Sequence, residues 1–157
     1  MIDFNQSLQI AKSAALLAGD FLLKAQGSDL KILLNQDRDL KLQLDIDTEK
    51  IIKDYISSHS NYSILGEETG LSDKLGEFFW VIDPLDGTSN FLRGIPISCV
   101  SIALMHELEP VLGVIYDFNH QELYFGHKES KAYINDQEIQ VSSLSLKNES
   151  TLFTGIP

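Results

Sequence analysis

The feature that most limits the fold is an unbroken apolar run at residues 78–82, Phe-Phe-Trp-Val-Ile, which ends abruptly in Asp83. A run of bulky residues of this length is typical of a strand that is covered on both faces. Pro84 follows the aspartate and fixes the direction of the chain, and the next charged residue is Asp86. We therefore expect a central strand that delivers two carboxylates to one edge of a sheet.

Roughly the first 60 residues follow a helical period instead. Asp3 is the predicted N-cap of a long helix, with Gln6 at the capping-box position and Gly27 at its end. Its apolar stripe consists of Phe4, Leu8, Ala11, Ala15, Ala18, Leu22 and Ala25.

A second helix is predicted to begin at Asp47 or Thr48 and to run to about His59. Its buried side is expected to carry Ile51, Ile52, Tyr55 and Ile56. Residues 30–44, which join the two helices, predict a mobile hairpin or loop.

Short apolar stretches with strand character make up most of the remaining chain. They predict strands at residues 62–65, 98–105, 110–116, 122–125, 132–134 and 151–154, with polar turns at 106–109 and 135–136. Helices followed by mostly antiparallel strands are typical of the α+β class. The last predicted strand lies close to Pro157, so we expect the chain to stop where a further structural element begins.

The charge of the chain argues against several kinds of partner. The sequence has 23 acidic and 12 basic residues in 157, a formal net charge of -11, and such a surface repels nucleic acid and anionic lipid. The first residues do not form a basic and then apolar leader, and no apolar run approaches the roughly 20 residues that span a bilayer. Cys99 is the one cysteine; we expect it to be a small buried apolar residue, in keeping with a reducing cytoplasm. Cations would have to separate these carboxylates from a phosphate ester.

Two acidic clusters follow apolar strands, Glu67-Glu68 after Gly66 and Asp83 with Asp86. If the two strands are neighbours, their carboxylates converge although they are far apart in sequence. Taken alone, Glu67-Glu68 is more often a solvated turn, and residues 83–88 alone are compatible with a turn closed by side-chain bonding. The sequence of buried strand, acid, turn, acid and Gly-Thr in one stretch favours a functional site.

Carboxylate oxygens without a nearby His or Cys favour Mg²⁺ or Mn²⁺ over zinc. Asp83 and Asp86 flank a stiff turn and can bridge two cations about 4 Å apart. The Leu85 carbonyl between them is free to face a metal ion. Gly87 permits close backbone approach, and the amides of Gly87 and Thr88, at the start of a short helix, can receive phosphate oxygens.

Residues 66–68 (GEE) and 83–88 (DPLDGT) together resemble the signature of the inositol monophosphatase family, the lithium-sensitive, magnesium-dependent phosphatases. The resemblance runs over essentially the whole chain. Residues 89–91 (SNF) are similar to the inositol monophosphatase branch rather than to the nucleotide-phosphatase branch.

The resemblance implies a metal-binding role for four residues. Glu67, Asp83 and the Leu85 carbonyl would hold a first metal ion. Asp83 and Asp86 would hold a second, and Glu67 would help to hold a third.

It also implies the groups that act on water and phosphate. Thr88 and Asp47 would orient the attacking water, so that with Glu67 they form the catalytic set. The amides of Gly87 and Thr88 would bind the phosphate. A competing interpretation of Asp47 is a helix N-cap, and the two roles are compatible.

The family has a layered αβαβα sugar-phosphatase fold, and residues 1–157 are expected to form its N-terminal helix-plus-sheet half, a metal-binding α+β domain. The family's downstream Trp-Asp block does not occur here, so the C-terminal half is expected to be absent. The implied activity is hydrolysis of inositol monophosphate or a similar polyol phosphate with Mg²⁺ or Mn²⁺, inhibited by Li⁺. Alternatives are a fructose-1,6-bisphosphatase, a nucleotide phosphatase, or an inactive metal-binding fragment. The expected partners are a small phosphorylated metabolite and either a second copy of the chain or a complementary C-terminal half.

Overall fold

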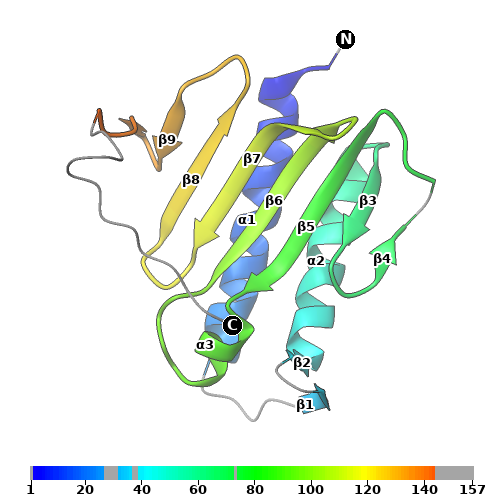
Figure 1. The fold of residues 1–157 in the computed structure, drawn as a ribbon, viewed down its shortest axis with the longest axis vertical. Coiled ribbons are helices and arrows are strands. Elements are labelled where there is room, and N and C mark those ends of the chain that lie inside the picture. Colours follow the sequence, from blue (N-terminus) through cyan, green and yellow to red (C-terminus); the bar gives the residue numbers. More distant parts are fainter. Residues whose placement is uncertain (1, 27–31, 37–38, 73, 144–157) are drawn as a thin grey trace.

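The computed structural model describes residues 2–26, 32–36, 39–72 and 74–143 (Figure 1). Two long helices pack against an eight-stranded sheet, which confirms the α+β class. The predicted strand at residues 151–154 and the helix end at Gly27 lie outside the described residues.

The first helix, α1 (Phe4–Ala25), begins where the sequence predicts. The Asp3 carboxylate caps it by accepting a hydrogen bond from the Gln6 amide at 3.0 Å. The predicted apolar stripe from Phe4 to Leu22 is buried against the sheet.

The segment between the helices forms an antiparallel hairpin of β1 (Ile32–Gln36) and β2 (Asp39–Leu42). The second helix, α2 (Gln43–His59), follows β2 directly, so the predicted start at Asp47 or Thr48 is wrong. Leu44 is buried inside the first turn, and the Thr48 hydroxyl donates back to the Leu44 carbonyl at 2.6 Å. The polar and apolar residues before Asp47 thus belong to the helix rather than to a loop.

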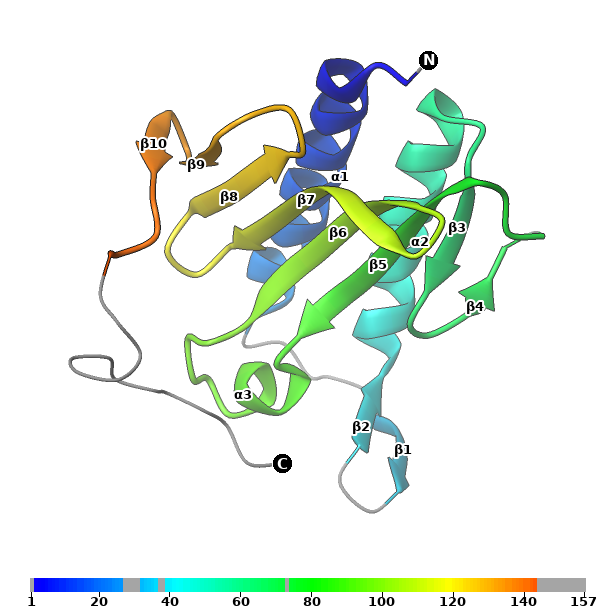
Figure 2. The same ribbon diagram turned by 45° about the horizontal axis from the view of Figure 1, so that its top comes forward.

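The sheet has the strand order β10-β9-β8-β7-β6-β5-β3-β4 (Figure 2). Its strands are β3 (Ser63–Gly66), β4 (Gly70–Leu71), β5 (Phe78–Asp86), β6 (Cys99–His106), β7 (Glu109–Asp117), β8 (Glu122–His127), β9 (Ala132–Ile134) and β10 (Gln137–Ile139). Neighbouring strands are antiparallel except β3 and β5, which run parallel. The short strands β4 and β10 were not predicted, and the other strand boundaries lie close to the predicted ones.

Helices α1 and α2 lie on the same face of the sheet (Figures 1 and 2). That face carries a continuous layer of buried apolar side chains, because cross-strand partners such as Trp80 and Leu104, or Ile82 and Ile102, stand on one side of the pleat. Among the described elements, neither long helix supplies the second cover that the sequence predicts for β5. None of the described helices is both long enough and apolar enough to cross a bilayer.

Candidate functional site

The parallel pairing of β3 and β5 brings the two acidic clusters together. Gly66 is in register with Ile82, and the Glu67 amide donates to the Ile82 carbonyl at 3.2 Å. The next residue after Gly66 is Glu67 and the next after Ile82 is Asp83, so the two acids lie side by side. The predicted convergence of the two strand ends is therefore confirmed.

The last residues of β5 leave the regular ladder. The register with β6 shifts between Asp83 and Asp86, and Asp86 then pairs with Cys99. The Leu85 amide donates to the Asp83 carboxylate at 3.1 Å, which fixes that side chain in the bend. The two aspartates thus lie on one strand end, separated by a bulge.

Asp83 is the most strongly perturbed carboxyl group at this edge. Burial raises its pKa, and the hydrogen bond to Glu67 and the negative charges of Glu67 and Asp86 raise it further, to about 7. The Leu85 amide acts in the opposite direction. The negative charges of Glu67 and Asp86 therefore disfavour the ionised form of Asp83.

Cys99 belongs to the same neighbourhood, which the sequence interpretation missed. Its thiol donates to the Asp86 carboxylate over 3.8 Å, and it is partly rather than fully buried. Burial and then the charges of Asp86 and Asp83 raise the pKa of Cys99 to about 12. The expectation of a purely apolar role is wrong, and the thiol stays protonated at neutral pH.

The turn after β5 leads into a short helix, α3 (Thr88–Leu92), as predicted. Gly87 has a φ of 84°, and an added Cβ would come within 2.7 Å of the Ile97 carbonyl, so both conformation and space require glycine. The Thr88 hydroxyl donates to the Leu85 carbonyl at 3.0 Å. The lone pairs of the Thr88 hydroxyl oxygen remain available to accept a hydrogen bond, and the Leu85 carbonyl oxygen keeps a second lone pair for another partner.

The hydrogen bond that the structure gives Asp47 lies within α2. Asp47 is exposed and accepts this hydrogen bond from the Gln43 side chain at 3.0 Å. The N-cap interpretation is wrong because the helix begins at Gln43. The start of α2 nevertheless lies at the end of the molecule where β5 ends and α3 follows (Figure 1).

Two acids on the buried side of α2 were also missed. Asp45 is 3% exposed and Glu49 is fully buried. Their spacing continues the stripe of Ile52 and Ile56, so a helix start placed at residue 43 would have marked both as inward-facing.

The donor set at the edge suits a hard divalent cation. Glu67, Asp83 and Asp86 offer carboxylate oxygens, Leu85 offers a carbonyl, and mutual repulsion among the acids is what a cation would relieve. Among the described residues, no three His, Cys, Asp or Glu side chains are yet gathered closely as the ligands of one ion. The residues fit such an ion in chemistry, and their side chains would have to turn toward it.

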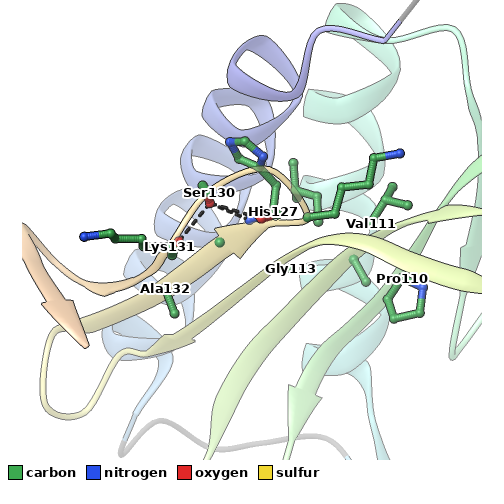
Figure 3. A pocket seen from close by; sticks show the side chains of 11 residues that line it. Pro110, Val111, Gly113, His127, Ser130, Lys131 and Ala132 are labelled. Carbon is green, nitrogen blue, oxygen red and sulfur yellow. Dashed lines mark hydrogen bonds between the residues drawn. The ribbon is translucent and has the colours of Figure 1, made fainter. Parts of the chain in front are cut away.

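At least three pockets lie on the sheet, and two of them border both β6 and β7. One, of about 320 Å³, is lined by β6, β7, β8 and the turn after β8, and in Figure 3 the Lys131 side chain points away from it, where its ammonium pairs with Glu138 at 2.7 Å. The other, of about 300 Å³, is lined by Asp86, Cys99, Asp117, His120 and Tyr124 among others. The second pocket adjoins the acidic edge.

The sequence and the fold of this chain are those of a known class of protein. The sequence profile described as "Inositol monophosphatase family" matches residues 3–157. The chain is 38% identical over 152 residues to the Nus factor SuhB of Xylella fastidiosa, covering 95% of this chain and 55% of that protein. It is 34% identical over 159 residues to the fructose-1,6-bisphosphatase/inositol-1-monophosphatase of Aquifex aeolicus, covering 99% and 59%.

Solved structures agree with this assignment. The extragenic suppressor protein suhB of Bartonella henselae superposes with a TM-score of 0.82 at 34% identity, over 88% of this chain and 55% of that one. The chain belongs to the inositol monophosphatase family. It spans a little more than half the length of these relatives.

Proposed function

We propose that the carboxyl end of β5 binds divalent cations and supports the hydrolysis of a small phosphate monoester, with inositol monophosphate or a similar polyol phosphate as substrate. The observation that carries this proposal is the juxtaposition of Glu67 with Asp83, whose pKa burial and neighbouring charge raise to about 7. Perturbed acids of this kind cluster at functional sites. Membership of the family supports the phosphatase class.

Mg²⁺, or Mn²⁺ in its place, would be held by Glu67, Asp83, Asp86 and the Leu85 carbonyl, with Li⁺ as an inhibitor. A cation bound there would neutralise the acids, attract the phosphate and lower the pKa of bound water. The acids would otherwise repel the substrate from a chain with a net charge of -11.

The chain's own groups would then bind and orient the reactants. The Thr88 hydroxyl donates its hydrogen to the Leu85 carbonyl, so its oxygen would be free to accept a hydrogen bond from the attacking water. The amides of Gly87 and Thr88 would bind phosphate oxygens, at a turn where the absent side chain of Gly87 leaves the backbone accessible. The pocket of about 300 Å³ beside Asp86 would receive the alcohol part of the substrate.

Two acids at the start of α2 are candidates for the second group that orients water. Asp47 is exposed and engaged by Gln43, whereas Asp45 is buried in the first turn. Matched variants distinguish the two acids. Asp45→Asn and Asp47→Asn make the same change, the loss of one carboxylate, at positions two residues apart. The variant that loses turnover identifies the acid.

The relatives' names bear on the substrate. The Aquifex aeolicus protein is named for both fructose 1,6-bisphosphate and inositol 1-phosphate, so either ester is a candidate. The Xylella fastidiosa protein is named a Nus factor, and a metal-binding chain that works with partner chains is the second candidate function. We place the protein in the cytoplasm, acting on a small phosphorylated metabolite as a homo-oligomer or with a complementary chain.

Titration calorimetry with Mn²⁺ tests the proposal on the protein and on Asp83→Asn. We expect binding that the substitution weakens by at least about 10-fold, because the Asp83 carboxyl group hydrogen-bonds to Glu67 and lies within electrostatic range of Asp86. Glu77→Gln, which removes one negative charge near the other end of β5, is the matched control. Phosphate release from inositol 1-phosphate and from fructose 1,6-bisphosphate then identifies the ester. Unchanged Mn²⁺ affinity in Asp83→Asn would refute the site.

A further inference from the structure

A fully buried charge holds the loop that carries Glu67. Glu49 lies on α2, its side chain is 0% exposed, and its carboxylate faces the loop at residues 66–70 that joins β3 to β4. We call residues 66–70 the Glu67 loop. A buried carboxylate is costly unless donors surround it, so its retention requires an explanation.

The donors come from the loop and from the same helix. The amides of Glu68 and Thr69 donate to Glu49 at 2.7 and 3.1 Å, and the Thr69 hydroxyl donates as well. The Lys53 ammonium lies 3.0 Å from the same carboxylate and also binds the Thr69 hydroxyl and the Gly70 carbonyl. Burial would raise the pKa of Glu49, but the hydrogen bonds from Thr69, Glu68 and Lys53 outweigh it and lower the pKa.

The Glu49 carboxyl group lies close against the backbone of Gly66. A Cβ built on Gly66 would overlap the Glu49 carboxyl group, so glycine is the residue that lets the helix approach the end of β3. The loop is thus fixed on both sides of Glu67. Before it, Gly66 pairs with Ile82 of β5; after it, the Glu68 and Thr69 amides bind Glu49.

We propose that Glu49, through Thr69 and Lys53, is a positioning residue that holds the Glu67 carboxylate against Asp83 for cation binding. This inference rests on the proposed function of that edge. The Glu49 carboxylate binds backbone amides of the Glu67 loop, so its effect on a bound cation would be indirect. Groups that orient a metal ligand in this way are typically worth about 10- to 100-fold in metal affinity.

Calorimetry with Mn²⁺ on the folded protein is the first test, with Glu49→Gln as the main variant. An amide in place of the carboxylate presents an NH₂ group to donors, so part of the loop is released, and we expect Mn²⁺ affinity to fall about 10-fold or more. Asp54→Asn is the matched control, because it removes the same charge from the same helix at an exposed ion pair with Lys50. It should leave the affinity unchanged.

A second pair of variants separates positioning from general stability. Thr69→Val removes the hydroxyl and should weaken Mn²⁺ binding, whereas Thr69→Ser keeps the hydroxyl and should restore it. Hydrogen exchange of the Glu68 and Thr69 amides, measured without metal, reports the loop directly. Exchange should accelerate in Glu49→Gln and stay slow in Asp54→Asn.

Two results would overturn the inference. One is Glu49→Gln with a lowered melting temperature but wild-type Mn²⁺ affinity, which would make Glu49 a purely structural residue. The other is slow exchange of both amides in Glu49→Gln, which would show that the loop does not depend on the carboxylate. If the wild-type protein bound no Mn²⁺ while exchange still followed Glu49, the proposed function would fail, and with it the role toward a cation, but not the loop contact.

Discussion

The two ends of β5 treat charge in opposite ways. Just before the strand begins, the exposed Glu77 carboxylate lies 2.8 Å from the His106 imidazole, and that ring stacks on Phe78 with 4.5 Å between centroids. Where the strand ends, Asp83 stands beside two further acids, Glu67 and Asp86. The start of β5 pairs a carboxylate with an imidazole, and the end of β5 places carboxylates beside one another.

Folding alone explains only the first arrangement. An arrangement that raises the pKa of Asp83 to about 7 works against the charged, metal-free form, whereas Glu77 at the start of β5 faces a hydrogen-bonding partner, His106. The same apolar interior serves both ends, since Trp80 and Ile82 lie between them in the buried layer. The contrast agrees with the proposal that the acidic end binds a ligand that brings positive charge.

The largest effect is expected from the interior that separates the two ends. Trp80 is 0% exposed and its indole N–H donates to the Ser60 hydroxyl at 3.1 Å, so Trp80→Ala should cost about 3–5 kcal/mol of unfolding free energy. Denaturant unfolding measures this loss, and Trp80→Phe should lose less. Folded Trp80→Ala should keep its Mn²⁺ affinity; a parallel loss of affinity would mean that the acidic end is not independent of the core.

A somewhat smaller effect is expected at Thr88, within the acidic end itself. Thr88→Ala should lower kcat for inositol 1-phosphate by about 100-fold with little change in KM, because a group that orients the nucleophile acts on the transition state. Thr88→Ser keeps the hydroxyl that donates to the Leu85 carbonyl and should retain most of the turnover. A rise in KM alone would instead make Thr88 a phosphate-binding residue.

The acidic end was predictable where local sequence determines it. The apolar run at residues 78–82, its acid and the following turn locate Asp83, Leu85, Asp86 and Thr88 on β5 and α3 without any long-range information. The neighbour relation of Glu67 and Asp83 required the further assumption that β3 and β5 adjoin. Their parallel register supplies that relation.

The parts that were missed depend on contacts between distant segments. Glu49 is 19 residues from the Glu68 amide that it binds. The helical spacing of residues around Glu49 does not indicate which distant residue it binds. Cys99 meets Asp86 because of the bulge in β5, whose position the sequence does not specify. The start of α2 was misplaced because the mixed polar and apolar pattern before Asp47 is also typical of a loop. In the structure, Leu44 and Asp45 are buried in the first turn of the helix.

The opposition between the two ends also predicts a pH dependence. The pKa of Asp83 in the folded chain is raised above its ordinary value, so its contribution to stability is full below about pH 4 and is lost as pH rises through about 7. Metal-free Asp83→Asn should therefore be more stable than wild type at pH 8, by about 1–2 kcal/mol once screening by water is allowed for, and should show no gain at pH 4.

Thermal unfolding in EDTA at the two pH values measures this difference. Adding Mn²⁺ at pH 8 should reverse the order, because the wild type then gains stability from binding that Asp83→Asn has lost. A metal-free variant less stable than wild type at pH 8 would show that the acids at this end stabilise the fold, and the contrast between the two ends would disappear.

The smallest effect is expected from the pair at the start of β5. Glu77 and His106 are 69% and 35% exposed, and exposed pairs contribute about 1 kcal/mol or less, so Glu77→Gln should cost a few tenths of a kcal/mol and less still in high salt. Denaturant unfolding at low and high salt measures this. Turnover and Mn²⁺ affinity should not change, although the substitution removes the same charge as Asp83→Asn. If Glu77→Gln weakened Mn²⁺ binding as far as Asp83→Asn does, net charge rather than the local arrangement of acids would govern the site. Equal effects at both ends would leave the position of Asp83 beside Glu67 without special importance, and a wide difference would locate cation binding at the end where the like charges meet.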